Sequence, residues 1–184
     1  MIVGLPMEAF TYLHVAISLT GVLSGIVAMT GMAFGRRMPG LTFVFLAATF
    51  ATSASGFLYP ANAVGVRHVV GAALIVLLTA ALVALYVARL RRGWRLVYVC
   101  AALVALWFNT SAAVVQAFRK IPVLTVRAGD DVESWTLALQ VTLGVGFVLI
   151  GALALRRGSG ERPAPMTGSP AGGSNILLRV PTLR

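Results

Sequence analysis

Five long apolar stretches, separated by short polar segments, dominate the pattern along the chain. They lie near residues 9–34, 41–59, 67–88, 96–118 and 135–155. Each is close to the length that an α-helix needs to cross a hydrocarbon core of roughly 30 Å, about 20 residues at a rise of about 1.5 Å each. The pattern therefore predicts an all-α fold, a polytopic transmembrane helical bundle of five spans.

Small and polar residues recur at helical spacing inside the first two predicted spans. One face of the first holds His14, Ser18, Gly21, Gly25 and Ala28, and one face of the second holds Thr49, Ser53 and Gly56. Helices in lipid gain nothing hydrophobic by meeting, so small residues that allow close approach and hydroxyls that hydrogen-bond hold them together. These stripes indicate helix packing.

The fourth predicted span carries the strongest polar stripe. Asn109 and Gln116 are seven residues apart, which is two helical turns, so they share one face. Such a face must meet protein, a ligand or water, because acyl chains offer no hydrogen bonds. Pro122 is expected to end this helix, just after Arg119 and Lys120 leave the lipid.

The strongest polar residues of four spans share one half of the predicted bilayer. His14 and Gln140 lie about 8 Å below the boundary and Asn109 about 15 Å below it, at about 1.5 Å per residue. His68 opens the third span. We expect these side chains to converge on a polar pocket in this half. The candidate ligand-binding residues are His14, His68, Asn109, Gln116, Gln140 and Arg67.

Basic residues fall unequally on the two sides of this bundle, which predicts its orientation. Eight arginines, in the segments 36–37, 89–95 and 156–157, lie on one side, whereas the other side has Arg67, Arg119, Lys120 and Arg127. Because cytoplasmic loops are enriched in Lys and Arg, the N-terminus is expected outside and the C-terminus in the cytoplasm. The polar pocket then belongs to the outer half.

Two units are expected along the chain. Residues 1–157 form the transmembrane helical domain. Residues 158–184 are rich in Gly, Pro and Ser and show no helical or strand period, so they are interpreted as a disordered cytoplasmic tail.

Composition agrees with this class. The 184 residues are 59% hydrophobic and 11% charged, with a mean hydropathy of +0.91, which is typical of a polytopic membrane protein. The net charge of +10 would suggest nucleic acid in a soluble domain, but here the basic residues sit at span ends and act as topology signals. We expect no nucleic-acid partner; the expected partners are the lipid bilayer and other membrane proteins or further copies of the chain.

The two histidines leave three interpretations open. They are structural residues hydrogen-bonded to neighbouring helices, or axial ligands of one b-type haem held between His14 and His68, or donors to a quinone, lipid or other amphiphile. No Asp or Glu lies within a predicted span, which disfavours an ion-coupled transporter. The single Cys100 excludes an internal disulfide.

Several short motifs resemble a group of small multi-pass bacterial membrane proteins. They are Ala51-Thr52-Ser53-x-x-Gly56-Phe57-x-x-Pro60, the His68-x-x-Gly71 opening of the third span, and Gln116-Ala117-Phe118-x-Lys120-x-Pro122. The resemblance covers about residues 10–155 and implies topology and a bacterial inner (cytoplasmic) membrane, without an activity. We therefore expect a non-enzymatic accessory or ligand-binding membrane protein; the alternative is a redox protein that holds haem b or a quinone at His14 and His68.

Overall fold

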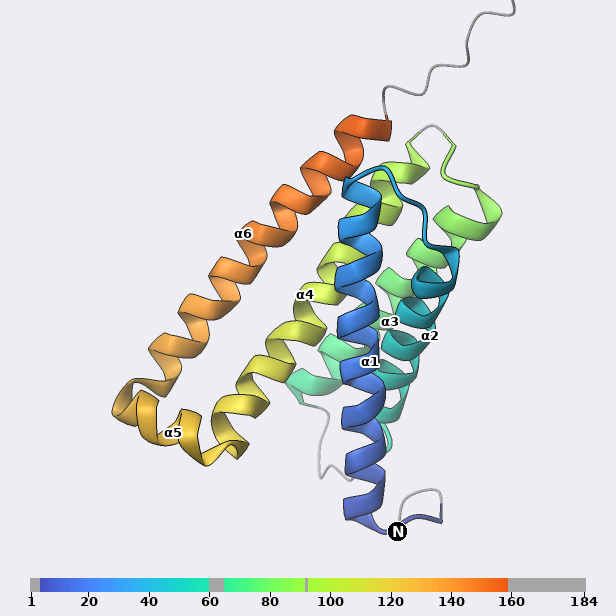
Figure 1. The fold of residues 1–184 in the computed structure, drawn as a ribbon. Coiled ribbons are helices and arrows are strands. Elements are labelled where there is room, and N and C mark those ends of the chain that lie inside the picture. Colours follow the sequence, from blue (N-terminus) through green and yellow to red (C-terminus); the bar gives the residue numbers. More distant parts are fainter. Residues whose placement is uncertain (1–3, 60–64, 92, 159–184) are drawn as a thin grey trace, which may run out of the picture.

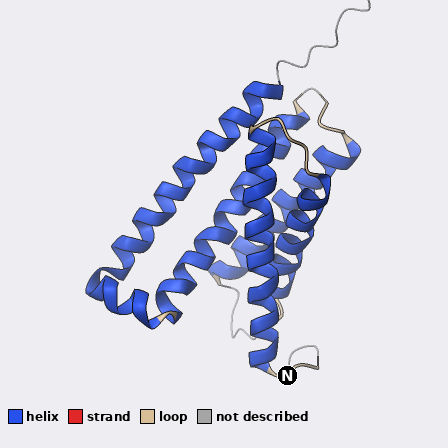
Figure 2. Cartoon of the chain, viewed as in Figure 1, coloured by secondary structure: helices blue, strands red, loops and turns tan. Residues whose placement is uncertain are grey.

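The computed structural model describes residues 4–59, 65–91 and 93–158, without the side chains of Val66, Arg67 and Gly158. The described residues form helices joined by short turns and contain no strands (Figure 2). The elements are α1 (Met7–Ala33), α2 (Pro39–Gly56), α3 (Val66–Leu82), the π-helix η1 (Val83–Val87), α4 (Trp94–Lys120), α5 (Pro122–Ala128), the 3₁₀-helix η2 (Gly129–Asp131) and α6 (Val132–Gly158).

Four helical segments of the described chain are long and apolar enough to cross a membrane. They are Met7–Ala33, His68–Val87, Trp94–Lys120 and Pro122–Arg157. The predicted all-α membrane bundle is thus confirmed for four of its five spans. The second predicted span is the helix α2, which has 18 residues and several hydroxyl side chains. The predicted tail lies beyond Gly158, outside the described residues.

The helices form an up-and-down bundle with α4 at its centre (Figure 1). The helices α1, α2, α3 and α4 pack side by side, and α6 leans on α1 and α4. More than half of the most apolar window of α4 is buried, compared with less than a quarter in α3 and α6. The large outward faces of α3 and α6 are therefore the surfaces that acyl chains would cover.

Gly25 lies where three helices leave no room for a side chain. A Cβ atom built on Gly25 would lie 2.6 Å from Cδ2 of Phe45 on α2 and 2.8 Å from Cδ1 of Leu106 on α4. Both neighbours are fully buried. The small-residue stripe predicted on the first span is thus a contact between α1, α2 and α4.

The segment between α4 and α6 differs from the sequence expectation of a loop. Ile121 takes an extended conformation and ends α4, as the following proline requires. Pro122 then begins a second helix, α5, because proline is well suited to a first helical position. The short α5 carries the chain across the end of the bundle from α4 to α6 (Figure 1).

Candidate functional site

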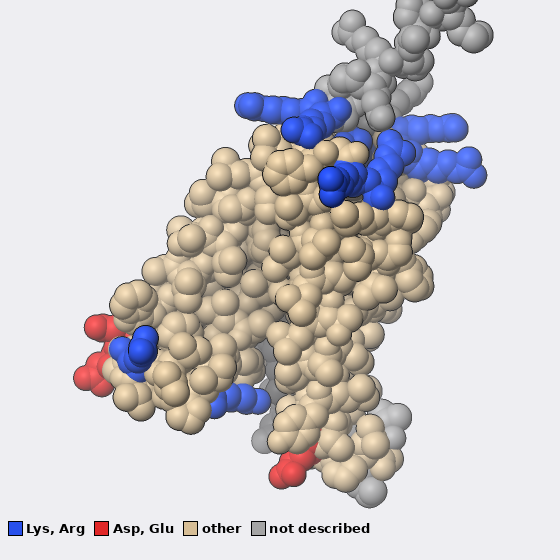
Figure 3. Space-filling model, in the orientation of Figure 1, with Lys and Arg blue, Asp and Glu red and all other residues tan. Residues whose placement is uncertain are grey.

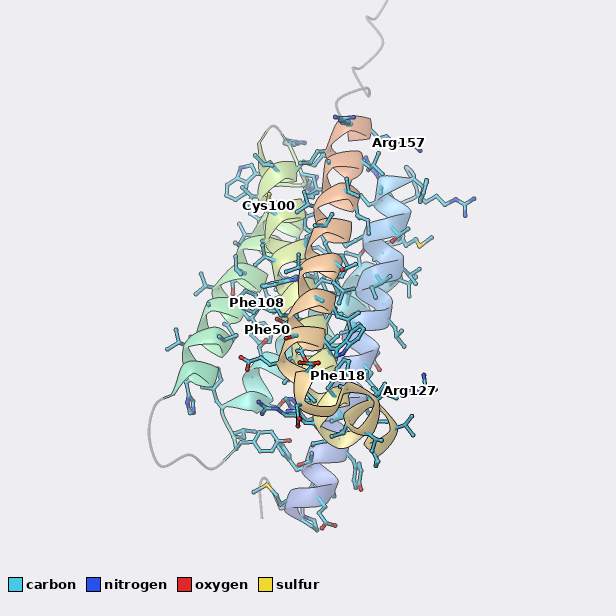
Figure 4. All side chains as sticks on the ribbon, turned by 90° about the vertical axis from the view of Figure 1, so that its left-hand side faces the viewer. Phe50, Cys100, Phe108, Phe118, Arg127 and Arg157 are labelled. Atoms are coloured by element: carbon cyan, nitrogen blue, oxygen red, sulfur yellow. The ribbon has the colours of Figure 1, made fainter. Side chains whose placement is uncertain are left out.

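Charge separates the two ends of the bundle. Figure 3 shows most of the Lys and Arg residues gathered at one end, where α1, α3 and α6 finish and α2 and α4 begin. We call this the arginine-rich end. Arg157 lies there, whereas Arg127 lies at the opposite end (Figure 4). The described acidic residues, Glu8, Asp130, Asp131 and Glu133, belong to the opposite end.

At this opposite end His14 contacts two residues from the end of α2. Its Nδ1 lies 2.8 Å from Oγ of Ser55, and its ring packs edge-on against Tyr59 at 5.5 Å. The hydroxyl of Ser55 donates to the carbonyl oxygen of Thr52. The hydroxyl of Ser55 thus links the His14 ring to the backbone of α2.

His68 occupies a different environment. Its Nδ1 accepts a hydrogen bond of 3.2 Å from the backbone N–H of Gly65, which caps the start of α3, and its ring packs against Phe57 at 5.8 Å. Among the described residues α1 and α3 do not approach each other, because α2 lies between them. The structure therefore brings each histidine to the end of α2, His14 from α1 and His68 from α3.

Asn109 joins α4 to α1 in the middle of the bundle. Its Oδ1 accepts a hydrogen bond of 2.9 Å from the hydroxyl of Ser18, and the side chain is buried. Its Nδ2 has no hydrogen-bond partner within the described chain, like the hydroxyls of Thr49, Thr52 and Ser111. Only part of the predicted convergence is thus observed. The hydrogen-bonded pair Ser18 and Asn109, which we call the polar seam, joins α1 to α4. The contact of His14 with Ser55 lies one turn of α1 nearer the N-terminus.

The remaining predicted site residues lie apart from this seam. Gln116 is exposed on the last turns of α4, where that helix leans away from α1 towards α5 (Figure 1). Gln140 on α6 is half-buried, and its backbone carbonyl accepts a hydrogen bond of 2.9 Å from Nε1 of Trp107. The side chain of Arg67 lies outside the described part of the structure.

A cavity lies at the arginine-rich end, opposite the predicted pocket. Its volume is about 650 Å³, within the range of roughly 300–1,000 Å³ that is usual for small-molecule sites. Helices α1, α2, α4 and α6, the π-helix η1 and the turns after α1 and η1 contribute to its wall. The charged lining residues are Arg36, Arg37, Arg89, Arg95 and Arg157, and no Asp or Glu lines the described cavity.

The backbone is irregular where α3 reaches this cavity. The last turn of α3 widens into the π-helix η1, with Ala88 N–H donating to the carbonyl of Val83 at 2.9 Å. Arg89 and Leu90 then take left-handed conformations, with φ of 51° and 55°. Such conformations are unfavourable for residues with a Cβ and occur disproportionately at binding sites. They place Tyr86, Arg89 and Leu90 in the cavity wall.

Arg95 of the cavity wall is held by a hydrogen bond to α6. Its Nη2 donates to the carbonyl oxygen of Ala154 on α6 at 2.8 Å. Its Nε is buried and has no hydrogen-bond partner among the described residues. A buried guanidinium N–H with no acceptor is costly, so an anion that supplied one would stabilise this arrangement.

Sequence reasoning treated these arginines as topology signals alone. It did not predict that three segments, 36–39, 86–95 and the end of α6, would meet around one cavity. Two features of the sequence could have indicated this cavity. All three basic segments are predicted on the same side of the bilayer, and Met32, Met38 and Tyr86 lie close to them in sequence. A basic segment beside flexible and aromatic apolar residues is a binding-site pattern as well as a topology signal.

Comparison with protein-family models, curated proteins and solved structures gives no match. The resemblance to small multi-pass bacterial membrane proteins therefore stays a prediction. The described residues also contain no group of three or more His, Cys, Asp and Glu side chains arranged to hold a metal ion. Functional inference for this chain rests on its own geometry.

Proposed function

We propose that the chain is a non-enzymatic, five-span membrane protein of a bacterial cytoplasmic membrane that binds an anionic amphiphile in the cavity at its arginine-rich end. One observation supports this most strongly: five arginines and no carboxylate line a cavity of about 650 Å³. Cations gathered around one opening attract an anion, and the anion would also supply the hydrogen-bond acceptor that the buried Nε of Arg95 lacks among the described residues.

The helix α2 supplies the fifth span in this proposal. Its 18 residues extend about 27 Å, close to the roughly 30 Å of a hydrocarbon core. Its hydroxyl side chains at Thr49 and Ser53 are buried against other helices, so they do not meet acyl chains. Five alternating spans place the two chain ends on opposite sides of the membrane.

The orientation follows from the charge separation between the two ends. Because the arginine-rich end carries most of the basic residues, it is assigned to the cytoplasm and the N-terminus to the outside. A periplasmic enzyme reporter fused after Arg157 should be inactive. An active reporter at this position would reverse the orientation.

Binding at the cavity is tested by thermal unfolding of the full-length protein in an uncharged maltoside detergent. Dodecyl phosphate, an anion with an apolar tail, is the probe. A ligand at 100 times its dissociation constant stabilises the native state by about 2.7 kcal/mol, which corresponds to about 5–10 °C in a chain of this size. The variant Arg36→Gln/Arg89→Gln should lose most of this shift.

A matched control separates cavity binding from general charge attraction. Arg91 and Arg156 are exposed at the same end but do not line the cavity. The variant Arg91→Gln/Arg156→Gln removes the same charge and should retain the shift. The proposal fails if dodecyl phosphate leaves the wild-type midpoint unchanged, or if both pairs of substitutions reduce the shift equally.

A further inference from the structure

The cavity at the arginine-rich end has two kinds of wall. Arginine side chains form part of it, and Ala28, Met32, Leu85 and Leu90 form an apolar part. A small inorganic anion would satisfy the first part and leave the second facing water. A molecule with a negatively charged head and an apolar body satisfies both.

In the proposed membrane orientation, the cavity lies at the level of the lipid headgroups. Exposed aromatic side chains, Phe34, Tyr86 and Trp94, surround this end of the bundle. Aromatic residues concentrate at membrane–water interfaces, and arginines at that level lie among lipid phosphates. The guanidinium carbon of Arg157 lies 5.7 Å from the ring centre of Phe34, which holds that cation at the same level.

We propose that the occupant of this cavity is an anionic phospholipid taken from the surrounding leaflet. Its phosphate lies among Arg36, Arg89 and Arg95, and the first part of its acyl chains lies against Met32 and Leu85. This inference rests on the proposed function, which requires only an anionic amphiphile, and it specifies the source of that amphiphile.

Two features indicate a built site for this headgroup, distinct from a diffuse basic surface. Arg95 is fixed by its hydrogen bond to Ala154 while its buried Nε–H has no acceptor. Arg89 is held by a left-handed backbone that follows a π-helical turn. A diffuse attraction to lipid would require neither a fixed guanidinium nor an unfavourable backbone.

Lipid selectivity tests this inference on the full-length protein. The protein in maltoside is titrated with phosphatidylglycerol and with phosphatidylcholine of identical acyl chains, and bound lipid is counted by native mass spectrometry. Inorganic phosphate and glycerol 3-phosphate are added in separate titrations. We expect one saturable phosphatidylglycerol per chain, bound at least about tenfold more tightly than phosphatidylcholine, and no comparable binding of the soluble phosphates.

Variants assign the selectivity to the cavity. Arg36→Gln/Arg89→Gln should weaken phosphatidylglycerol binding by about tenfold or more, whereas Arg91→Gln/Arg156→Gln should change it by less than about threefold. Arg36 and Arg89 are both exposed, and unchanged helical circular dichroism would show that the variant is folded. If that variant unfolds, Leu85→Trp, which fills the apolar wall, replaces it and should weaken the same lipid.

The possible failures are distinguishable. Equal affinity for the two lipids, or equal weakening by the two pairs of substitutions, overturns the lipid inference. If dodecyl phosphate still binds in the cavity in those cases, the proposed function remains. If no anion binds at all, both fail.

Discussion

The substitution Gly25→Ala tests the close contact of α1, α2 and α4 on which the bundle depends. The added Cβ would lie 2.6 Å from Phe45 and 2.8 Å from Leu106, whereas carbon atoms attract best at about 3.5–4.0 Å. Overpacking of this kind costs about 1–3 kcal/mol. Alanine recovers about 1 kcal/mol as the better helix former, so the net loss of stability relative to the wild type is about 0–2 kcal/mol. Relative to a Gly→Ala substitution that meets no neighbour, the loss is the full cost of about 1–3 kcal/mol.

Thermal unfolding in detergent measures this loss by circular dichroism. Gly146→Ala is the matched control, because a Cβ there meets nothing within 4 Å, and its midpoint should stay unchanged or rise. The Gly25→Ala midpoint should lie about 2–12 °C below that of Gly146→Ala in a chain of this length. Equal midpoints for the two variants would refute the close packing of these three helices.

Three further results are expected. Arg89 has a positive φ, so the variant Arg89→Gly should be about 1 kcal/mol more stable than Arg89→Ala in chemical unfolding. Both variants should lose dodecyl phosphate binding. Equal stabilities of the two variants would contradict the left-handed backbone. A double-mutant cycle of Ser18→Ala and Asn109→Ala should give a coupling of about 0.6 kcal/mol or more from their 2.9 Å hydrogen bond, and zero coupling would argue against it. Trp107→Phe removes the donor to the carbonyl of Gln140 and should lower stability by about 1 kcal/mol, with Trp135→Phe, exposed on the same helix as Gln140, as the neutral control.

The apolar pattern predicted the helices well because membrane spans must satisfy their backbone internally. The observed ends, such as Ala33, Lys120 and Gly158, lie within about three residues of the expected ones. The prediction that Pro122 ends α4 is confirmed. The same rule did not predict α5, because proline both ends one helix and suits the first turn of the next.

Side-chain convergence was harder to predict, because it depends on how helices lean and on local caps. Asn109 and Gln116 do share a face of α4, but that helix diverges from α1 before it reaches Gln116, which is exposed. His68 accepts a hydrogen bond from the backbone N–H of Gly65 at the start of its own helix. Helical periodicity does not predict such a local cap. The polar seam of Ser18 and Asn109 could have been predicted from the sequence, because both residues lie on helix faces that are rich in small residues and pack against other helices.

The cavity at the arginine-rich end was not predictable from periodicity for a different reason. It forms where Arg36, Arg89 and Arg157, distant in sequence, meet at the ends of three helices. A π-helical turn and two left-handed residues, Arg89 and Leu90, complete its wall. Neither left-handed position is a glycine, so the sequence carries no ordinary signal for this backbone conformation.

The central claim is that ligand binds at the arginine-rich end, and hydrogen–deuterium exchange tests its location most directly. The full-length protein in maltoside is compared with and without saturating dodecyl phosphate. We expect slower exchange in the turn after α1, Gly35 to Met38, and in the strained end of α3, Tyr86 to Leu90. Unchanged exchange in both segments, or protection confined to the region of His14 and Ser18 at the opposite end, would contradict the account.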